Sequence, residues 1–531
     1  MIAAELETLL ARHEHDAWSP EILAAHDDHD RFPTEAVAVL DEAGFAENYL
    51  LGPDSSFPDM TTLIRTVARR DLTVAIAHGK TFLGSASVWV AGAPAQVAAH
   101  AGRVRAGEVV CWGLTERDHG ADLLAGEFAA TRVDGGWRLD GEKWLINNAT
   151  RGGTACVLAR TNPHGGGRGF SVFLVDRRQL SDEVWQPLPK VLTHGIRGAD
   201  ISGFAARGAT VGDDAVVGEV GEGVTVVLKA LQLTRIACSG LSLGAADHVL
   251  RIARDFVADR RLYGRALADV PHVRRNLGRA AATALTAEAV ALVATRSVHA
   301  LPGELSVVSA ITKAFVPTQV QHVLGSVAEL LGVRGFLTSP PGTGFAKLER
   351  DHRICAIFDG STAVNRAALL TQMPRLGRLL RAERTDADGV RAATRLDAAL
   401  PAFDRDRLVL TSPTGCSLVQ SLHGVTTWAP EVEAVLDGLA ADAAAFVPAI
   451  GGLPSEAFDL AARYERAYAI ACCLRLWSEN QRNSPLWTDG LWLRACLAVL
   501  LDRPDGEAFD ALAEVLLDWK APAFSITEEA A

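Results

Sequence analysis

The sequence predicts an α+β protein with a β domain between helical regions, because the spacing of its apolar residues changes twice along the chain. From Pro20 to about residue 106, apolar side chains recur every three or four positions, as in helices. From about residue 108 they alternate, as in strands, and after Gly221-Glu222-Gly223 the helical spacing returns. The 531 residues are 49% hydrophobic, which is enough apolar material for more than one buried core.

The composition limits the classes of partner. The formal net charge of −12 opposes general binding to nucleic acid or anionic lipid, so we expect small molecules or proteins as partners. The eight cysteines include no CxxC pair, which argues against a zinc knuckle or a disulfide framework. Glu5 and Glu7 stand where a secretory signal would be basic and then apolar, and no stretch reaches about 18 uninterrupted apolar residues. We therefore expect a cytoplasmic protein without a membrane span.

The same pattern predicts four domains. Residues 1–107 are expected to form a helical domain and residues 108–218 a β domain, in which two strands meet at the hairpin sequence Asp134-Gly135-Gly136. Further strands are expected at TACVLAR, at GFSVFLVD and from Phe204 to Val217. Residues 219–385 are predicted to form a bundle of long helices. An Asp-rich connection then leads into an additional helical domain over residues 386–531.

Four weaker patterns favour structural explanations. HEHD at residues 13–16 and HDDHD at residues 26–30 contain metal-ligating residue types, but their spacing fixes no common face, so we expect solvated helix ends and no metal. HGGGRG at residues 164–169 lacks the preceding strand and following helix of a phosphate-binding loop. The tryptophans between residues 477 and 492 suit core packing. No GxGxxG follows a strand, which argues against a nicotinamide-binding Rossmann domain.

Six motifs that occur in order over residues 1–375 resemble those of the acyl-CoA dehydrogenase family. They are CWGLTERDHGADL, GEKWLINNA, GIRGAD, DRRLYG, LLGVRGF and RDHRICAIFDGST. The resemblance implies an N-terminal helical domain, a middle β-barrel or sandwich domain and a C-terminal helical bundle, here with an extra helical domain. It also implies bound FAD and a homodimer or tetramer, and in the family an added C-terminal helical domain goes with a dimer.

The resemblance places the flavin ring beside the β domain. Thr115 and Ala121 lie beside the flavin by this comparison, with Ala121 replacing the family's usual Ser. Leu145 and Asn147 stand where the family usually has an aromatic residue and a Thr, and an Asn can still donate a hydrogen bond to the ring edge. These motifs match what a flavin requires, namely an apolar wall and hydrogen-bond partners at its polar edge.

The remaining implied cofactor contacts lie in the helical region. Arg260, Glu329 and Gly335 match positions that meet the ADP half of a flavin across a subunit boundary. Glu329 replaces the usual Gln, and Val333 replaces one Gly of the family's Gly-Gly pair. Taken singly, each of these residues is equally well explained as an ordinary surface or turn residue. The motifs add a last set of implied contacts, which comprises Tyr263, Ser361 and Asn365.

Asp359 is the candidate catalytic base. It stands in Asp359-Gly360-Ser361 where the family has the Glu of a Glu-Gly-Thr motif, which removes the α-proton of an acyl thioester. Without the family, Asp359 is also a plausible cap for the helix that follows. The alternative position of the base is Thr234, which cannot act as a base at neutral pH. Arg235 is expected either near Asp359, where its charge would keep the carboxylate ionised, or as a bridge between helices.

The expected activity is FAD-dependent α,β-dehydrogenation of an acyl thioester carried by CoA or by a carrier protein, with an electron-transfer flavoprotein or oxygen as electron acceptor. Two alternatives remain open. One is a flavin-dependent oxidase or monooxygenase of the same fold in which Asp359 is structural. The other is a scaffold whose site has decayed and which acts by association, although the retained Arg235, Arg260 and carboxylate argue against it.

Overall fold

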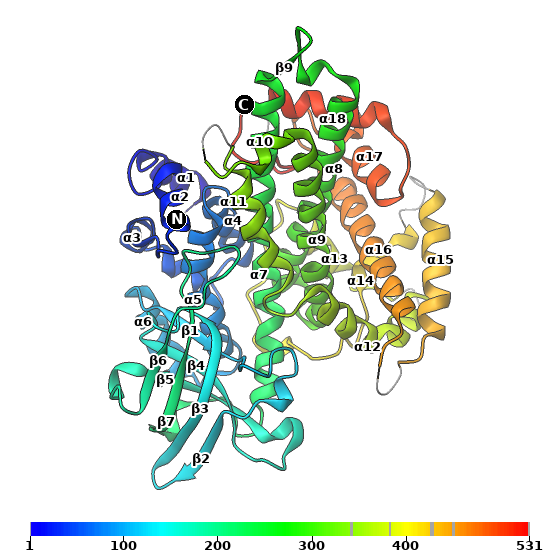
Figure 1. Ribbon diagram of the computed structural model, residues 1–531. Helices are drawn as coiled ribbons and strands as arrows, with labels where there is room; N and C mark the ends of the chain where they lie inside the picture. Colours follow the sequence, from blue (N-terminus) through cyan, green and yellow to red (C-terminus); the bar gives the residue numbers. More distant parts are fainter. Residues whose placement is uncertain (1, 340–342, 382–383, 425–429, 449–451, 529–531) are drawn as a thin grey trace. The chain divides into compact units, whose positions relative to one another are not determined.

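The computed structural model describes residues 2–339, 343–381, 384–424, 430–448 and 452–528, and these residues form two compact units (Figure 1). Unit 1 comprises residues 1–64, 73–234 and 402–410, and unit 2 comprises residues 65–72, 235–401 and 411–531. The helical spacing seen in the sequence produces helices in both units, and the alternating segment produces the sheet of unit 1. The division into four domains stays a prediction.

Unit 1 begins with the expected helices. They are α1 (Ala3–Arg12), α2 (Pro20–Asp28), α3 (Thr34–Glu42), α4 (Phe57–Ala68), α5 (Leu72–Ala91) and α6 (Pro94–Arg105), of which α4 ends and α5 begins in unit 2. The strands are β1 (Val110–Gly113), β2 (Ala129–Val133), β3 (Gly136–Asn147), β4 (Thr154–Arg160), β5 (Phe170–Asp176), β6 (Trp185–Leu188), β7 (Ile201–Gly212) and β8 (Val216–Val217).

The strands form one mixed sheet in the order β6-β7-β3-β2-β4-β5-β8, with β1 pairing in parallel with β4. The predicted hairpin is confirmed, since β2 and β3 pair antiparallel with Val133 opposite Gly136, and Gly135 in the turn has a φ of 78°. The strands predicted at TACVLAR and GFSVFLVD are β4 and β5. The short strands β1 and β6 were not predicted, because four residues show too little alternation.

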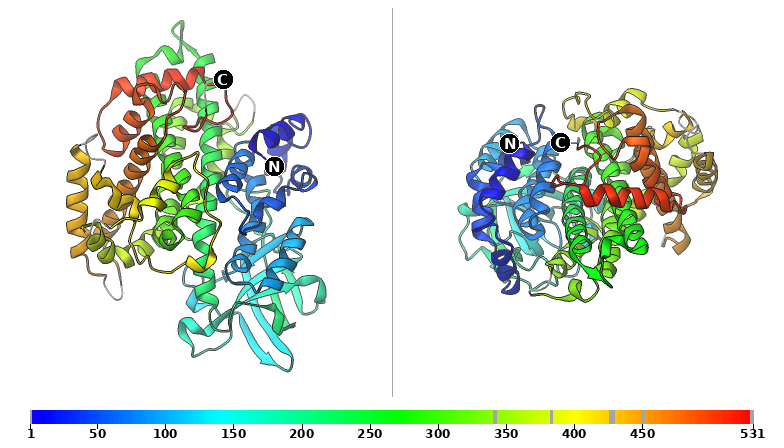
Figure 2. Two further views of the ribbon diagram at one scale, coloured as in Figure 1. Left: turned by 180° about the vertical axis from the view of Figure 1, so that it is seen from behind. Right: turned by 90° about the horizontal axis from the view of Figure 1, so that it is seen from above.

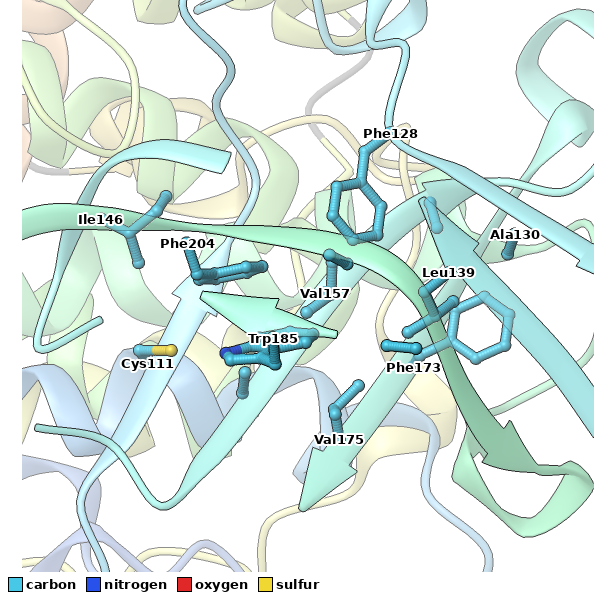
Figure 3. Packing of buried hydrophobic residues seen from close by; sticks show 14 of the residues in the cluster. Cys111, Phe128, Ala130, Leu139, Ile146, Val157, Phe173, Val175, Trp185 and Phe204 are labelled. Atoms are coloured by element: carbon cyan, nitrogen blue, oxygen red, sulfur yellow. The ribbon is translucent and has the colours of Figure 1, made fainter. Parts of the chain in front are cut away.

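Aromatic side chains fill the core beside this sheet (Figure 3). The rings of Trp185 and Phe204 stack with centroids 4.3 Å apart, and Phe128 meets Phe204 edge-on. Trp137 and Phe173 form a second edge-on pair at 5.6 Å. These rings come from four strands and one connection, so their packing holds the sheet in register.

Unit 2 is a helical bundle. Its elements are α7 (Gly223–Asp259) from Arg235 onward, β9 (Arg261–Leu262), β10 (Arg265–Ala266), α8 (Pro271–Ala300), α9 (Leu305–Leu331), α10 (Val333–Phe336), α11 (Phe345–His352), α12 (Thr362–Arg381), α13 (Ala387–Thr394), α14 (Ser417–Gln420), α15 (Pro430–Ala445), α16 (Ser455–Glu479), α17 (Leu491–Leu500) and α18 (Gly506–Asp518).

Helix α8 is the centre of unit 2. It packs against α9 and also against α13, α16, α17 and α18. Figure 2 shows α18 (red) lying across the green helices of this bundle. Helix α15 packs on α12. Helices α7 and α8 are long and apolar enough to cross a membrane by length and composition, but 78% and 89% of their apolar windows are buried within the protein. Such burial is typical of core helices.

Candidate active site in unit 2

The candidate base lies on a loop between two helical segments of unit 2. The loop follows a short 3-10 helix, Arg353–Ala356, and ends where α12 begins at Thr362. Asp359 has a φ of 55° and Gly360 a φ of 94°, so two consecutive residues adopt the left-handed region. Asp tolerates this conformation better than most residues, and glycine adopts it freely. The left-handed pair turns the chain sharply just before α12.

Close packing also favours glycine at position 360. A Cβ atom there would lie 3.1 Å from Asn365 Nδ2 and 3.2 Å from Arg235 Nη2, in addition to the strain of the positive φ. The sequence Asp-Gly at 359–360 is therefore set by both backbone conformation and close packing.

Arg235 fixes the backbone of this loop. Its Nε donates a hydrogen bond to the carbonyl oxygen of Asp359 at 3.0 Å, and the residue is only 9% exposed. Burial lowers the pKa of Arg235, and the nearby charge of Asp359 opposes that shift. Arg235 thus lies beside Asp359, which is one of the two arrangements expected from the sequence, and its hydrogen bond goes to the main chain of residue 359.

Lys313 was not identified from the sequence, yet it ties the same loop from α9. Its Nζ donates to the carbonyl oxygens of Cys355 at 2.8 Å and Gly360 at 3.2 Å, and lies 5.2 Å from the ring centre of Phe358. Burial lowers the pKa of Lys313, while Cys238 and Asp359 act in the opposite direction. A lone lysine in the apolar segment SAITKAFV was the available signal.

The carboxylate of Asp359 has a second unpredicted neighbour. Cys238, one turn beyond Arg235 on α7, places its Sγ 3.4 Å from Asp359 Oδ2 in donor geometry. Three helical elements therefore converge on one loop: α7 contributes Arg235 and Cys238, α9 contributes Lys313, and α12 follows directly.

Asp359 does not cap α12. The Oγ of Ser361 accepts the backbone N–H of Val364 at 3.3 Å, so Ser361 occupies the capping position. Asn365 is fully buried, and its Nδ2 donates to the carbonyl oxygens of Gly360 and Ser361 at 2.8 and 3.0 Å. In this structure Ser361 and Asn365 support the loop. The interpretation of Asp359 as the cap of this helix is therefore wrong.

In unit 1, the structure brings Thr115 next to the strand that carries Leu145 and Asn147. Thr115 Oγ1 donates to the Trp144 carbonyl at 2.8 Å, and the Trp144 N–H donates to the Thr115 carbonyl at 3.0 Å. Leu145 has a φ of 57° and is 44% exposed, while Ala121 is also exposed. The loop after β1 and the end of β3 thus form one connected surface.

Asn147 lies at the end of β3 and is 8% exposed. Its Nδ2 is 3.4 Å from the Ile76 carbonyl, and its Oδ1 is buried with no hydrogen-bond partner in the described part of the chain. A buried unpartnered acceptor is costly, so this oxygen suits a donor from a bound group, such as the N–H at a flavin ring edge.

The predicted contacts to ADP separate into exposed and buried residues. Arg260 lines an open groove of about 440 Å³ together with Arg334, and the other lining residues are Ile252, Asp255, Phe256, Asp259 and Thr343. Tyr263, between β9 and β10, is fully exposed with a φ of 51°. Gly335 is buried, whereas Glu329 is exposed on α9 and does not line the groove.

The groove suits a phosphorylated group through its two guanidinium groups, which donate well to phosphate oxygens. The two aspartates in its wall oppose an anion, so binding there depends on Arg260 and Arg334. The residues of both sets fit FAD in kind: an unpartnered acceptor and an exposed apolar side chain for the ring, and arginines for phosphates.

Comparisons with known proteins relate two segments of the chain to one family. Residues 111–206 match the family model for the acyl-CoA dehydrogenase middle domain, and residues 221–373 match the model for the acyl-CoA dehydrogenase C-terminal domain. The chain is 26% identical over 358 residues to the probable acyl-CoA dehydrogenase FadE25 of Mycobacterium tuberculosis. This alignment covers 65% of this chain and 88% of the relative.

Two solved structures extend the comparison at the level of fold. An acyl-CoA dehydrogenase complexed with FAD from Bacillus anthracis aligns with a TM-score of 0.71 and 18% identity, over 97% of this chain and 86% of that one. The prolyl acyl carrier protein oxidase AnaB aligns with a TM-score of 0.62 and 15% identity, over 70% of this chain and 98% of that one. The predicted fold class is confirmed. Residues 111–206 and residues 221–373 are therefore the middle and C-terminal domains of the acyl-CoA dehydrogenase family.

Proposed function

We propose that the protein is an FAD-dependent oxidoreductase that introduces a double bond between the α and β carbons of an acyl thioester, with Asp359 as the base. The observation that carries the proposal is the geometry of the loop that contains Asp359. Arg235 and Lys313 hold the main chain of this loop through hydrogen bonds to the carbonyl oxygens of residues 359 and 360. Family membership and the likeness to an FAD complex support the choice of cofactor. The groove beside Arg260 and the oxygen of Asn147 support its binding.

The proposed reaction divides between base and cofactor. Asp359 takes the α-proton, and the electrons of that C–H bond form the new C=C bond as hydride leaves the β-carbon. When bound, FAD supplies the two-electron acceptor for that hydride. The α-proton is too weakly acidic without polarisation of the thioester carbonyl, and we assign part of that polarisation to the backbone N–H of Asp359.

The proposed cofactor contacts follow from the same assignment. Those proposed for the ring and its surroundings are Thr115, Ala121, Leu145, Asn147, Ser361 and Asn365, and those proposed for the ADP half are Arg260, Tyr263, Glu329 and Gly335. Arg260 has the clearest support, because it lines a groove with a second arginine. Glu329 has the weakest, since it is an acidic side chain outside that groove.

A second candidate function is oxidation of a carrier-bound acyl group with oxygen as the electron acceptor. The observation that favours it is the likeness in fold to a prolyl acyl carrier protein oxidase. Both candidates share the thioester and the base, and they differ in the carrier and in the acceptor that reoxidises the flavin.

The decisive experiment records the visible spectrum of the purified protein under anaerobic conditions while acyl-CoA or acyl-carrier thioesters are added. Dehydrogenation predicts that a saturated acyl thioester bleaches the flavin. Admission of oxygen then separates the candidates, because rapid recolouring with release of peroxide indicates the oxidase. Bleaching only by an external reductant would instead support a monooxygenase, and absence of flavin a decayed scaffold.

The assignment of the base is tested by Asp359→Asn, which keeps size and tolerance of the left-handed region but removes the base. The variant should retain its fold and its flavin, and its rate of anaerobic flavin bleaching should fall by at least about a hundredfold. Asp489→Asn is the matched control, since Asp489 is exposed and has a φ of 52°. If Asp359→Asn bleaches at the parent rate, Asp359 is not the base. Asp359→Glu then reports whether the pocket favours the shorter side chain.

A further inference from the structure

We infer that Cys238 is a positioning residue for the Asp359 carboxylate, a role that rests on the function proposed above. The Sγ–Oδ2 separation of 3.4 Å, in donor geometry, joins a side chain of α7 to the carboxylate itself. Arg235 and Lys313, by contrast, donate to main-chain carbonyls of the loop. The loop is therefore held by two kinds of contact, which fix its backbone and its functional group separately.

Contacts to the backbone of the loop do not by themselves set the orientation of the carboxylate. With the main chain of residue 359 held in place, two torsion angles still decide where the carboxylate oxygens lie. The thiol of Cys238 donates to Oδ2, one of the two oxygens of this carboxylate. Cys238 is only 2% exposed, so water does not compete freely for this contact.

Position matters more for Asp359 than for a longer base. Aspartate is one methylene shorter than glutamate, and a displacement of about 1 Å at the reacting atoms can cost on the order of a hundredfold in rate. A hydrogen bond that selects one orientation of the short side chain directly affects how often it reaches the α-proton.

The charge around this contact is also defined. Arg235 approaches from α7 and Lys313 from α9, both largely buried, and Cys355 and His352 are the further titratable groups that interact with Lys313. A donor to the ionised carboxylate stabilises that form over the protonated one. Loss of the thiol therefore should change the pH dependence of the reaction as well as its rate.

The test compares Cys238→Ala, Cys238→Ser and the parent holoenzyme by the rate of anaerobic flavin reduction between pH 5.5 and 9. Cys238→Ala should reduce flavin about tenfold more slowly, and the acid limb of its rate profile should move about 0.5 to 1 pH unit higher. Cys238→Ser keeps a hydrogen-bond donor, so the acid limb of its profile should lie within about 0.3 pH unit of the parent's. If the role of Cys238 were purely structural, Cys238→Ala would be less stable, but the acid limb of its pH–rate profile would not move.

The matched control is Cys496→Ala, because Cys496 is a similarly buried thiol of unit 2 that donates to the Ala282 carbonyl. It should leave rate and profile unchanged. If Cys238→Ala does not retain flavin, Cys238→Val supplies a donor-free variant of closer volume.

Two results separate this inference from the proposed function. If Cys238→Ala matches the parent in rate and profile while Asp359→Asn abolishes bleaching, the inference is overturned and the function stands. Equal defects in Cys238→Ser and Cys238→Ala overturn it as well, because the donor would not be the relevant property. If Asp359→Asn still bleaches normally, it is the assignment of the base that fails.

Discussion

Backbone conformation marks the candidate site at the scale of single residues. Most of the described non-glycine residues with positive φ are Asp or Asn, which tolerate it, and the bulky exceptions are Leu145, Ile196 and Tyr263. Two of these three are positions that the sequence assigned to cofactor binding. Strained residues persist only where the surrounding structure requires them, and they gather at functional sites. The position of Leu145 therefore supports its assignment, whereas the positive φ of Tyr263 belongs to the two-residue turn that joins β9 and β10.

A second residue-scale feature is His352, the fully buried last residue of α11. Its ring nitrogens contact Gln321 Oε1 at 3.1 Å and Ser242 Oγ at 3.2 Å. Burial, assisted by the charge of Lys313, lowers the pKa of His352 to about 3. The folded protein thus holds His352 neutral over a pH range in which the unfolded chain protonates it at about pH 6.5.

We predict that this histidine makes the protein lose stability as pH falls from 6.5 towards 3. In that window the unfolded state binds one more proton at this position, so the free energy of unfolding drops by about 1.4 kcal/mol per pH unit. Above pH 6.5 the contribution is constant. Urea unfolding at pH 7.5, 6.0 and 5.0 measures how the free energy of unfolding changes with pH. His352→Gln should reduce this slope by the contribution of one proton, about 1.4 kcal/mol per pH unit. His164→Gln, at an exposed loop residue, should leave it unchanged.

At the scale of elements, close helix crossings decide how the C-terminal helices attach. Gly278 on α8 lies against the backbone of Phe509 on α18, so closely that a Cβ atom at position 278 would overlap the Phe509 carbonyl oxygen. Arg275 on the same helix pairs with Asp510 at 2.6 Å, but it is about half exposed and stabilises the contact little. Backbone proximity, more than the ion pair, defines this contact.

Gly278→Ala should therefore destabilise unit 2 even though alanine favours helices. A methyl group at this crossing must displace α18, which we expect to cost about 2 kcal/mol or more. Gly325→Ala is the matched control, because Gly325 lies on α9 with no atom within 4 Å of its would-be Cβ. That change should be neutral or stabilise by up to about 1 kcal/mol. Thermal unfolding of both variants measures the difference, and equal melting temperatures would contradict the role of the crossing.

At the scale of the whole molecule, the helices after residue 410 are part of the bundle core. Helices α16, α17 and α18 pack on α8, whose residues from Leu277 to Ala300 are almost all buried. Arg366 on α12 and Glu465 on α16 add a bidentate ion pair at 2.8 and 2.9 Å, in which Glu465 is 2% exposed. Helices α16, α17 and α18 therefore cover an apolar face of α8 that would otherwise contact water or another subunit.

We predict a homodimer for the full chain, twice 56.4 kDa, and a changed assembly for a chain ending at Arg384. Removal of the later helices exposes the apolar face of α8, which favours larger assemblies or aggregation. Sedimentation velocity distinguishes these states, with flavin content measured on each species. A shortened chain that remains a dimer, with unchanged flavin and rates, would show that the extension governs neither assembly nor activity. A flavin-loaded monomer of the full chain would contradict the expectation that Arg260, Glu329 and Gly335 meet a flavin across a subunit boundary.

The sequence alone determined the features that depend on local spacing. Alternation of apolar residues and the Asp-Gly turn specified the β2–β3 hairpin, and the helical period specified α7 to α9, because both periods arise within a few neighbouring residues. Six ordered motifs identified the family and drew attention to Asp359 and Arg235. The proximity of these two was expected only through that resemblance.

Tertiary structure alone decided what surrounds the carboxylate. Cys238 is 121 positions from Asp359, and Lys313 is 47 positions from Gly360, so neither contact leaves a periodic signal in the sequence. The capping position was likewise settled by backbone geometry, since the left-handed turn at residues 359–360 moves the start of α12 to Thr362 and gives the cap to Ser361. Local spacing encodes the helices, but contacts between distant segments exist only once α7 and α9 have packed around the loop.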